Sequence, residues 1–440
     1  MQTQRDHVHA YQFLMGRMSS ALVLNDPASA EVPSRRAITG AIIGLVLALL
    51  ISVGFGVFGF IFPGGNKSWQ AEGAIVVEKE TGTRYINVNG VLHPTLNYAS
   101  AVLRQGAGAK VSLVSRASLR DAPRGAPMGI PGAPQSLPSA QDIVGAHWLF
   151  CLSGGNDFTL DFDPDTPAAT LPTDRYALVE SPTATQYVVW GGAKHRVAHP
   201  VVTAALGMAG EQPIRAPQQW LDALPDGPEL APAVINGAGS NGPVVGGQAR
   251  QVGQLFEYHA ANGDVELFVL RRDGLAPVSR TEFTLLDAMA GSPDPVRIDA
   301  AAVAAAPRSA DRSLTRRLPD LSQARRLDRA AESLCLRQTP VGAQVRSEVV
   351  LAPQSPQGGV VRMPPGTGVV AAAVPVPAGR RTPDRYLITG GTKYLIPDDD
   401  SIRALGYGSV PVRPISTELL AALPSGPDLS RAAMGVTGRG

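Results

Sequence analysis

The sequence predicts a mixed α+β protein: a single transmembrane helix followed by an extracytoplasmic domain in which four small α/β repeats surround a central β-rich domain. Three observations predict this fold, namely one long uncharged apolar run, internal similarity at a fixed offset, and abundant glycine and proline. The 47 glycines and 38 prolines in 440 residues are typical of many short elements joined by turns. With 44% hydrophobic residues, the chain has enough apolar material for more than one core.

The charges are nearly balanced, which excludes one class of partner. Lys and Arg number 39 and Asp and Glu number 37, giving a formal net charge of +2. A nucleic-acid-binding surface needs a strong excess of basic residues, so we expect no nucleic acid among the partners.

Residues 1–37 are predicted to form a cytoplasmic N-terminal amphipathic helix and tail. The helix runs over 7–24 and stops at Asn25-Asp26-Pro27. Its apolar side chains recur at spacings of three and four: Val8, Tyr11, Leu14, Met15, Met18 and Leu22. A lone amphipathic helix must cover this face against lipid or a partner. Because the helix carries few basic residues, we expect it to dock on a partner protein through Tyr11, Leu14, Met15, Met18 and Leu22.

Residues 38–62 are predicted to form the transmembrane helix. They contain no charge, and 25 residues at about 1.5 Å per residue span roughly 37 Å, enough to cross a bilayer. The run is too long for the apolar part of a signal peptide, so we expect an uncleaved anchor in the plasma membrane. Arg35 and Arg36 precede it and only Lys67 closely follows, which places the N-terminus in the cytoplasm.

The orientation of the membrane helix decides whether the two cysteines, Cys151 and Cys335, are expected to be reduced or disulfide-bonded. On the cytoplasmic side, two distant cysteines are as often a reduced pair. On the far side of the membrane they face an oxidising compartment, so a disulfide is favoured over two buried thiols.

The internal repeat is clearest at an offset of 199 residues, where 187–230 aligns with 386–429 without a gap. The matching residues are largely glycines, prolines and apolar residues, which chance does not place together. The identical pairs are Tyr187 and Tyr386, Gly191 and Gly390, Gly192 and Gly391, Lys194 and Lys393, Ala205 and Ala404, Leu206 and Leu405, Gly207 and Gly406, Leu221 and Leu420, Ala223 and Ala422, Leu224 and Leu423, Pro225 and Pro424, Gly227 and Gly426, Pro228 and Pro427, and Leu230 and Leu429.

Each copy reads as a tight hairpin with a Gly-Gly turn, followed by a helical stretch that ends at Leu-Pro-x-Gly-Pro. A third copy begins at Tyr85, with Asn89-Gly90 as its turn, and a degenerate fourth begins at Leu267. The predicted order is repeat 1 (63–140), a first segment of the central β domain (141–182), repeat 2 (183–245), repeat 3 and a connection (246–330), a second segment of the central β domain (331–377), and repeat 4 with the C-terminus (378–440).

The central domain is predicted from five further strand-like segments: 147–152, 175–179, 254–258, 334–337 and 369–374. Cys151 and Cys335 lie in two of them, so a disulfide would join neighbouring strands of the central sheet. The Pro-, Gly- and Ala-rich stretches 121–138 and 228–247 read as linkers, and 294–328 as a connection that contains a helix.

No catalytic, metal or cofactor site is predicted. The stretch 59–68, GFIFPGGNKS, has an Asn between its last glycine and its lysine, and it lies at the end of the membrane helix instead of a strand-to-helix turn. His195 and His199 lack the intervening Glu and a third ligand of a zinc protease. Three adjacent carboxylates at Asp398, Asp399 and Asp400 are more often solvated than bound to calcium. No Gly-x-Ser-x-Gly elbow is present.

The chain resembles the EccB family, component B of the actinobacterial ESX or type VII secretion systems. The resemblance covers essentially the whole chain and is carried by 11–22 (YQFLMGRMSSAL), 92–103 (LHPTLNYASAVL), 124–134 (RGAPMGIPGAP) and the single cysteine pair. It implies a cytoplasmic helix, one transmembrane helix, and four periplasmic repeats around a disulfide-bridged central β domain. It also implies the partners: a membrane ATPase (component C), a multi-spanning component D, component E, and other periplasmic domains of its own kind.

Three functions follow from these observations. The first is a structural core component that anchors and organises the periplasmic part of an inner-membrane secretion complex. The second is a membrane-anchored module that binds peptidoglycan, with Tyr187 and Trp190 as contacts, although aromatic residues of a hairpin more commonly pack across strands. The third is ATP hydrolysis, which the family is sometimes described as performing although no nucleotide-binding motif is visible. We expect a non-enzymatic protein without cofactors.

Overall fold

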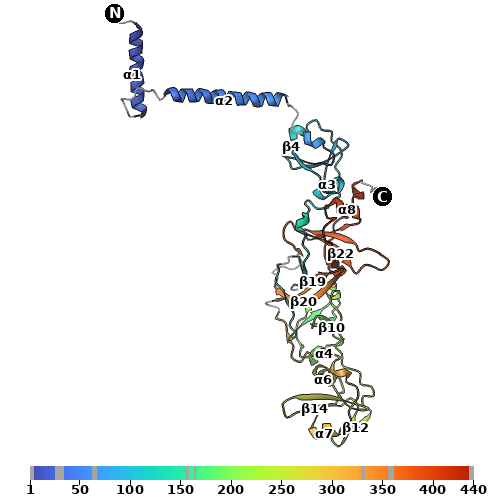
Figure 1. The fold of residues 1–440 in the computed structure, drawn as a ribbon. Helices are drawn as coiled ribbons and strands as arrows, with labels where there is room; N and C mark the ends of the chain where they lie inside the picture. Colours follow the sequence, from blue (N-terminus) through green and yellow to red (C-terminus); the bar gives the residue numbers. More distant parts are fainter. Residues whose placement is uncertain are drawn as a thin grey trace. The chain divides into compact units, whose positions relative to one another are not determined.

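A computed structural model describes residues 4–24, 34–61, 67–153, 158–162, 165–328, 332–354 and 361–435 (Figure 1). Backbone contacts divide the chain into two compact units, each described by itself. The first contains residues 1–71, 78–81 and 113–122, and the second contains 72–77, 82–112 and 123–440.

Two long helices come first in the chain. Helix α1 spans Gln4–Leu24 and helix α2 spans Ser34–Ile61. Within α2, the 23 residues Ala37–Gly59 are long and apolar enough to cross a membrane, and none of this stretch is buried against the rest of the protein. The predicted stop of the first helix at Asn25-Asp26-Pro27 and the predicted last membrane residue, Phe62, lie outside the described residues.

Four sheets then share one strand order, in which the second strand of each repeat lies between the third and the first, and the fourth strand lies beyond the first. In repeats 2, 3 and 4 the first three strands form an antiparallel meander and the fourth runs parallel to the first. A helix connects the third strand to the fourth in every case. The repeat is therefore larger than the predicted hairpin and helix, because it includes one strand before them and one after.

The elements of the repeats are listed in order of strand, strand, strand, helix, strand. Repeat 1 has β1 (Ile75–Glu78), β2 (Arg84–Val88), β3 (Val91–Pro94), α3 (Tyr98–Gln105) and β4 (Val111–Val114). Repeat 2 has β8 (Arg175–Glu180), β9 (Gln186–Trp190), β10 (Ala193–Arg196), α4 (Pro200–Ala205) and β11 (Ile214–Arg215). Repeat 3 has β14 (Leu255–His259), β15 (Val265–Arg271), β16 (Gly274–Pro277), α6 (Arg280–Asp287) and β17 (Val296–Ile298). Repeat 4 has β22 (Gly368–Val374), β23 (Arg385–Thr389), β24 (Thr392–Ile396), α8 (Asp399–Ala404) and β25 (Arg413–Ser416).

The predicted hairpin turns have the backbone that their residues favour. Both central residues have positive φ in three repeats: 53° and 81° at Asn89-Gly90, 57° and 84° at Gly191-Gly192, and 56° and 76° at Gly390-Gly391. Glycine adopts this conformation freely and asparagine tolerates it, and the twist of such a turn matches that of the two strands.

A second short helix follows the fourth strand, and the chain then returns beside the third strand of the same repeat. These helices are η2 (Arg116–Leu119), α5 (Gln218–Asp222), α7 (Ala300–Ala305) and α9 (Thr417–Ala422). Parallel bridges join Leu92 to Arg124, Lys194 to Asp226, Leu275 to Arg308, and Lys393 to Ser425. The Leu-Pro-x-Gly-Pro motif lies in this returning segment.

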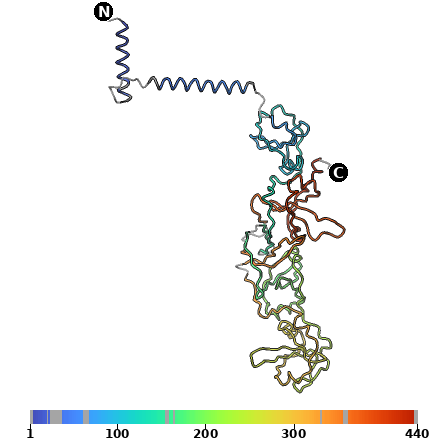
Figure 2. Tube along the Cα trace, viewed as in Figure 1, coloured from blue at the N-terminus to red at the C-terminus, as the bar shows by residue number. Residues whose placement is uncertain are grey.

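The central sheet has the strand order β21-β6-β5-β19-β20-β7. Its strands are β5 (Trp148–Leu152), β6 (Phe158–Asp161), β7 (Ala169–Thr170), β19 (Glu332–Val341), β20 (Gln344–Pro353) and β21 (Val361–Arg362). Figure 2 shows these segments, distant in sequence, running side by side. The prediction was wrong for three of its five strands, because 175–179, 254–258 and 369–374 are the first strands of repeats 2, 3 and 4. All five are apolar, so composition did not separate them; the domain boundaries themselves stay predictions.

The stretches predicted as linkers are packed parts of the fold. Within 121–138, Ile130 is buried and the Pro138 carbonyl accepts a hydrogen bond of 2.8 Å from the Tyr407 hydroxyl. Within 228–247, Leu230 is fully buried and 241–245 forms a strand, β12 (Asn241–Val245), which pairs with β13 (Gln248–Gln251). Proline lacks an N–H but keeps its carbonyl, so proline-rich chain can still bond along an edge strand.

The segment 294–328 contains the expected helix, α7, together with β17, η4 (Ser313–Thr315) and β18 (Arg325–Arg326). Three further 3-10 turns are η1 (Lys67–Gln70), η3 (Ala140–Asp142) and η5 (Ala432–Met434). Strand β18 adds to the repeat 2 sheet by pairing with β8.

The hydrophobic cores show which repeats pack on each other. Repeats 2 and 4 share one large core with the central sheet, in which helices α5 and α9 contact each other. Repeat 1 packs on repeat 4 through α3 and α8, and repeat 3 packs on repeat 2 through α6 and α4. We call repeats 2 and 4 the inner repeats and repeats 1 and 3 the outer repeats.

Candidate functional site

The first candidate surface is the apolar face of α1. All five residues predicted to dock on a partner are at least half exposed: Tyr11 66%, Leu14 60%, Met15 50%, Met18 59% and Leu22 84%. At about 3.6 residues per turn they lie along one broad face of the helix. So large an exposed apolar surface on one helix marks a contact with another protein or with lipid.

The second candidate surface is α2. Its Leu, Ile, Val and Phe side chains with described exposure, such as Leu45 and Phe55, are at least half exposed. In water that exposure would be strongly unfavourable, whereas the hydrocarbon of a bilayer solvates such side chains. Arg35 and Arg36 lie in the first turn of α2, at the end connected to α1.

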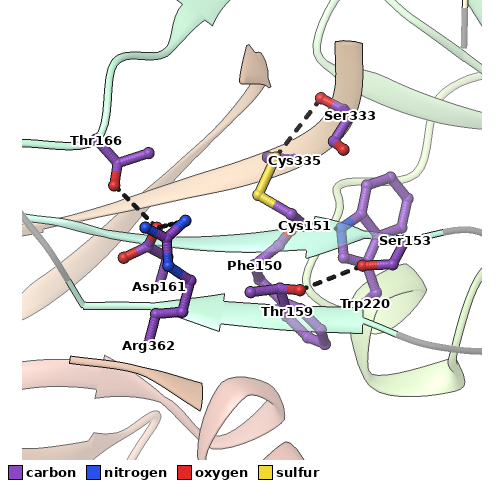
Figure 3. Close-up of a disulfide and its surroundings, with 10 residues drawn as sticks. All are labelled: Phe150, Cys151, Ser153, Thr159, Asp161, Thr166, Trp220, Ser333, Cys335 and Arg362. Atoms are coloured by element: carbon purple, nitrogen blue, oxygen red, sulfur yellow. Dashed lines mark hydrogen bonds and ion pairs between the residues drawn. A yellow bond between two sulfur atoms is a disulfide. The ribbon is translucent and has the colours of Figure 1, made fainter. Parts of the chain in front are cut away.

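The disulfide joins the middle of the central sheet. Cys151 on β5 and Cys335 on β19 lie directly opposite each other in the antiparallel pair, with their sulfur atoms 2.05 Å apart. Figure 3 shows the bond between the two strands. Cys151 and Cys335 pack with Leu149 in one cluster, whereas Phe150 of the same strand packs with Trp220 in the large core. The Trp220 indole N–H donates to the Phe150 carbonyl over 2.9 Å, and this ring is fully buried in the large core. One side of β5 therefore packs on α5 while the other carries the disulfide.

His195 has a packing role. It is 4% exposed and its Nδ1 donates a hydrogen bond of 3.0 Å to the Pro228 carbonyl. A Cβ on Gly227 would lie 2.3 Å from the His195 ring, so only glycine fits there. His199 is exposed at the N-cap position of α4. The structure therefore gives this pair no common ligand.

The same contact recurs in two other repeats. A Cβ on Gly125 would lie 2.2 Å from the ring of His93, whose Nδ1 is 2.9 Å from the Ala126 carbonyl. In repeat 4 a Cβ on Gly426 would lie 2.2 Å from the ring of Tyr394. The alignment of the repeats identified the recurring glycine but not the ring that packs on it, because His195 aligns with Tyr394 and the two residues are not identical. The signal that could have identified the contact is that both aligned side chains are flat rings.

The recurring lysines also act within the repeats. The Lys194 ammonium donates to the Leu224 carbonyl over 2.9 Å and lies 2.9 Å from an Asp226 carboxylate oxygen. The Lys393 ammonium donates to the Leu420 carbonyl, and burial lowers the pKa of Lys393. Both carbonyls belong to the last turn of the short helix or to the residues just after it, where the helix lacks its own donors.

The three adjacent carboxylates at the start of α8 each take part in a different contact. Asp398 caps the helix by accepting from the Ser401 N–H at 2.7 Å. Asp399 pairs with Arg385 at 2.6 Å, and Asp400 pairs with Arg431 at 3.2 Å. Among the described residues, no three His, Cys, Asp or Glu side chains gather as metal ligands would. Of the stretch 59–68, residues 62–66 lie outside the described residues, and Lys67 opens the turn η1.

Tyr187 and Trp190, the predicted cell-wall contacts, are partly buried. Tyr187 packs against the large core, and Trp190 packs against the core between repeats 2 and 3. The Trp190 indole N–H donates to the Thr173 carbonyl over 2.8 Å. Both aromatic side chains therefore contribute to hairpin packing.

An ion pair with a buried carboxylate, which sequence reasoning missed, lies in repeat 3, and the same carboxylate joins this repeat to the segment before it. Glu282 on α6 is fully buried, accepts from the Ala233 N–H at 2.7 Å, and pairs with Arg317 at 2.7 Å. Arg317 also donates to the Ala231 carbonyl. A single Glu on a short helix gives no sequence signal, because its partners lie at distances that only the fold brings together.

Comparisons with known proteins agree on one family. The family described as "Type VII secretion system ESX-1, transport TM domain B" matches residues 1–438. A relative named "ESX-3 secretion system ATPase EccB3" from Mycolicibacterium smegmatis is 29% identical, over 97% of this chain and 89% of the relative. A Mycobacterium tuberculosis relative with the same name is 27% identical, over 97% of this chain and 88% of its own.

Solved structures show the same fold. A chain of an intact ESX-5 inner membrane complex matches all of this chain and 96% of its own, with a TM-score of 0.62 at 24% identity. A chain of the "EccB3 dimer from the ESX-3 core complex" matches 83% of this chain and 100% of its own, with a TM-score of 0.60 at 25% identity. These matches confirm the predicted fold class.

Proposed function

The chain belongs to the EccB family of type VII secretion components, and we propose that it is a structural core component of an inner-membrane ESX complex, where it anchors and organises the periplasmic assembly. The observation that carries this proposal is the family match over residues 1–438. Similar chains are parts of an ESX-5 inner membrane complex and an EccB3 dimer. We therefore propose as partners the other core components, namely the membrane ATPase component C, the multi-spanning component D and component E, together with further copies of this chain.

The division between exposed and enclosed apolar surface supports an anchoring role. The repeats and the central sheet bury their large apolar side chains in shared cores. Helices α1 and α2 instead expose theirs. We propose that α2 spans the plasma membrane, that Arg35 and Arg36 keep the N-terminus in the cytoplasm, and that the repeats lie on the other side.

We propose that α1 docks on a cytoplasmic part of the complex through Tyr11, Leu14, Met15, Met18 and Leu22. Partner docking fits this helix better than binding to anionic lipid, because Asp6 offsets one of its two arginines, Arg5 and Arg17. A carboxylate in the middle of such a face would be desolvated without a partner charge, so it should weaken docking strongly.

The test is a detergent-extracted pull-down of tagged full-length protein, with mass spectrometry and size analysis. The wild type should recover a large complex containing the membrane ATPase and the multi-spanning component. Met18→Glu should lose these partners, while His9→Glu, which lies two and a half turns away and so on the opposite face, should keep them. A wild-type chain recovered alone would refute complex membership; equal recovery with both variants would refute docking through this face only.

ATP hydrolysis stays a separate hypothesis, because only the printed names of relatives support it. Its test is the turnover of ATP per mole of chain across successive purification steps. A constant value would support hydrolysis by this protein, and a value falling to background would assign it to a co-purifying enzyme.

A further inference from the structure

The chain after α2 consists of two halves that repeat each other in sequence order. The first half contains repeat 1, the β5–β6 hairpin and repeat 2; the second contains repeat 3, the β19–β20 hairpin and repeat 4. Cys151 and Cys335, 184 residues apart, occupy the same position in the first strand of each hairpin. They pair directly with each other in an antiparallel ladder. A position that faces its own equivalent in this way lies on a local two-fold axis.

The contacts around this axis are exchanged between the halves. Each outer repeat packs on the inner repeat of the other half: α3 on α8, and α6 on α4. The chain entering each central hairpin also adds to the other half's inner repeat, since Ile143 bridges to Gly368 and Arg326 pairs with Tyr176. The equivalent helices α5 and α9 contact each other. The interface is therefore of the isologous kind, by which two copies of one unit associate.

One segment, residues 231–254, connects the halves. The non-covalent contacts between the halves are the same whether the two halves belong to one chain or to two. The connection itself is also bonded to repeat 3, through Ala231 to Arg317 and through Ala233 to Glu282, which favours the arrangement seen here. Two further features favour pairing within a chain. The first is the effective concentration that the connection provides. The second is the covalent bond between Cys151 and Cys335.

We propose that the Cys151–Cys335 disulfide is a latch that stops two copies of this chain from exchanging halves. With the bond formed, the halves of one copy stay paired. Without it, two copies in one membrane can each donate a half to the other, giving a domain-swapped dimer in which every inter-half contact is kept. The partner is thus a second copy of this chain, and the proposal does not depend on the secretion role.

The chemistry of the latch is thiol–disulfide exchange. Closing it forms one S–S bond from two thiols, which give up two protons and two electrons to a disulfide oxidant such as oxidised glutathione, itself reduced to two thiols. In a swapped dimer the same two positions meet across chains. The bond can then form between Cys151 of one copy and Cys335 of the other.

The test uses two full-length variants with different tags, Cys151→Ser and Cys335→Ser, produced together in one membrane, extracted in detergent and oxidised with oxidised glutathione. Neither variant can form the bond alone, and both positions are buried, so random collision is disfavoured. The expected result is a disulfide-linked heterodimer on a non-reducing gel that disappears on reduction. Homodimers of either variant should be absent, because exchange never brings two Cys151 or two Cys335 together.

Folded variants that stay monomeric on the gel, or homodimers as abundant as the heterodimer, would overturn the proposal. If the variants do not accumulate, the wild type answers the question. Two differently tagged wild-type copies are produced in reducing medium, oxidised after extraction, and cut at a protease site inserted between Gly239 and Ser240. Halves carrying different tags joined by the disulfide support exchange, and only same-tag pairs refute it.

Discussion

The inner and outer repeats have the same topology but different buried residues. At the start of the third strand, the inner repeats carry Lys194 and Lys393, whose ammonium groups bond to carbonyls near the end of a short helix. The equivalent residues of the outer repeats are Leu92 and Leu275, both fully buried. The difference follows from surroundings, because only the inner repeats place their short helices, α5 and α9, in the core of the central sheet.

The shared surroundings of repeats 2 and 4 explain why their sequence similarity, at an offset of 199 residues, is the clearest in the chain. Repeats 2 and 4 meet the same central sheet from symmetric positions, so the same side chains suit both. Repeats 1 and 3 instead pack on an inner repeat, and their internal polar contacts differ. Asn97 of repeat 1 donates a neutral hydrogen bond to the Ile130 carbonyl, whereas Glu282 of repeat 3 forms an ion pair with Arg317. Similarity between repeats therefore measures shared surroundings as much as shared ancestry.

The largest effect is expected from truncating the inner core. Trp220→Ala should lower the free energy of unfolding by about 3 to 5 kcal/mol, because it leaves a cavity and removes the bond to the Phe150 carbonyl. The hydrogen-exchange protection lost should extend over repeat 2, the central sheet and repeat 4. Leu286→Ala, in the core of repeat 3, is the matched outer change, and its loss of protection should stay within that repeat. If the loss of hydrogen-exchange protection extended equally far from both sites, the inner and outer cores would not differ in this respect.

The next effect tests the internal polar contacts of the two outer repeats. Glu282→Ala removes the buried carboxylate that pairs with Arg317 and accepts from the Ala233 N–H, so we expect a loss of about 3 kcal/mol in urea unfolding. Asn97→Ala removes a neutral amide that donates to the Ile130 carbonyl and caps α3 by accepting from the Ser100 N–H, so it should have a smaller effect of about 1 to 2 kcal/mol. A larger loss of unfolding free energy for Asn97→Ala than for Glu282→Ala would contradict this prediction, because it would show that the ion pair contributes less to stability than the neutral amide.

A moderate effect is expected where a ring lies on glycine. Gly227→Ser should destabilise by about 1 to 3 kcal/mol, because the new Cβ overlaps the His195 ring. Repeat 3 naturally combines Ala276 and Ser309 at the equivalent positions. The double variant His195→Ala, Gly227→Ser should therefore lose less than the two single changes added together. Strict additivity in this thermodynamic cycle would contradict the contact.

The smallest effect concerns pH. Burial lowers the pKa of Lys393 below its ordinary value of 10.5, so between the lowered value and 10.5 the unfolded chain binds a proton that the folded chain does not. Stability therefore rises with pH across that window. Lys393→Leu, which introduces the residue of the outer repeats, should abolish this part of the rise in the urea midpoint. A variant that keeps the wild-type slope would assign the rise to other groups.

The sequence by itself determined the features that depend on neighbours along the chain. The uncharged run gave α2, the spacing of Tyr11, Leu14 and Met18 gave α1, and the Asn-Gly and Gly-Gly pairs gave the hairpin turns, since all of these follow from local periodicity and backbone preference. The family resemblance is likewise confirmed by the match over residues 1–438.

Only the tertiary structure decided which strands pair and which halves meet. The apolar segments 175–179 and 147–152 are interchangeable by composition, yet the first completes repeat 2 and the second pairs with β19. The ring of His195 on Gly227 and the partners of Glu282 join residues more than thirty positions apart. Such contacts depend on how whole sheets pack, and a pattern read along one segment holds no information about the side chains that the fold brings against it.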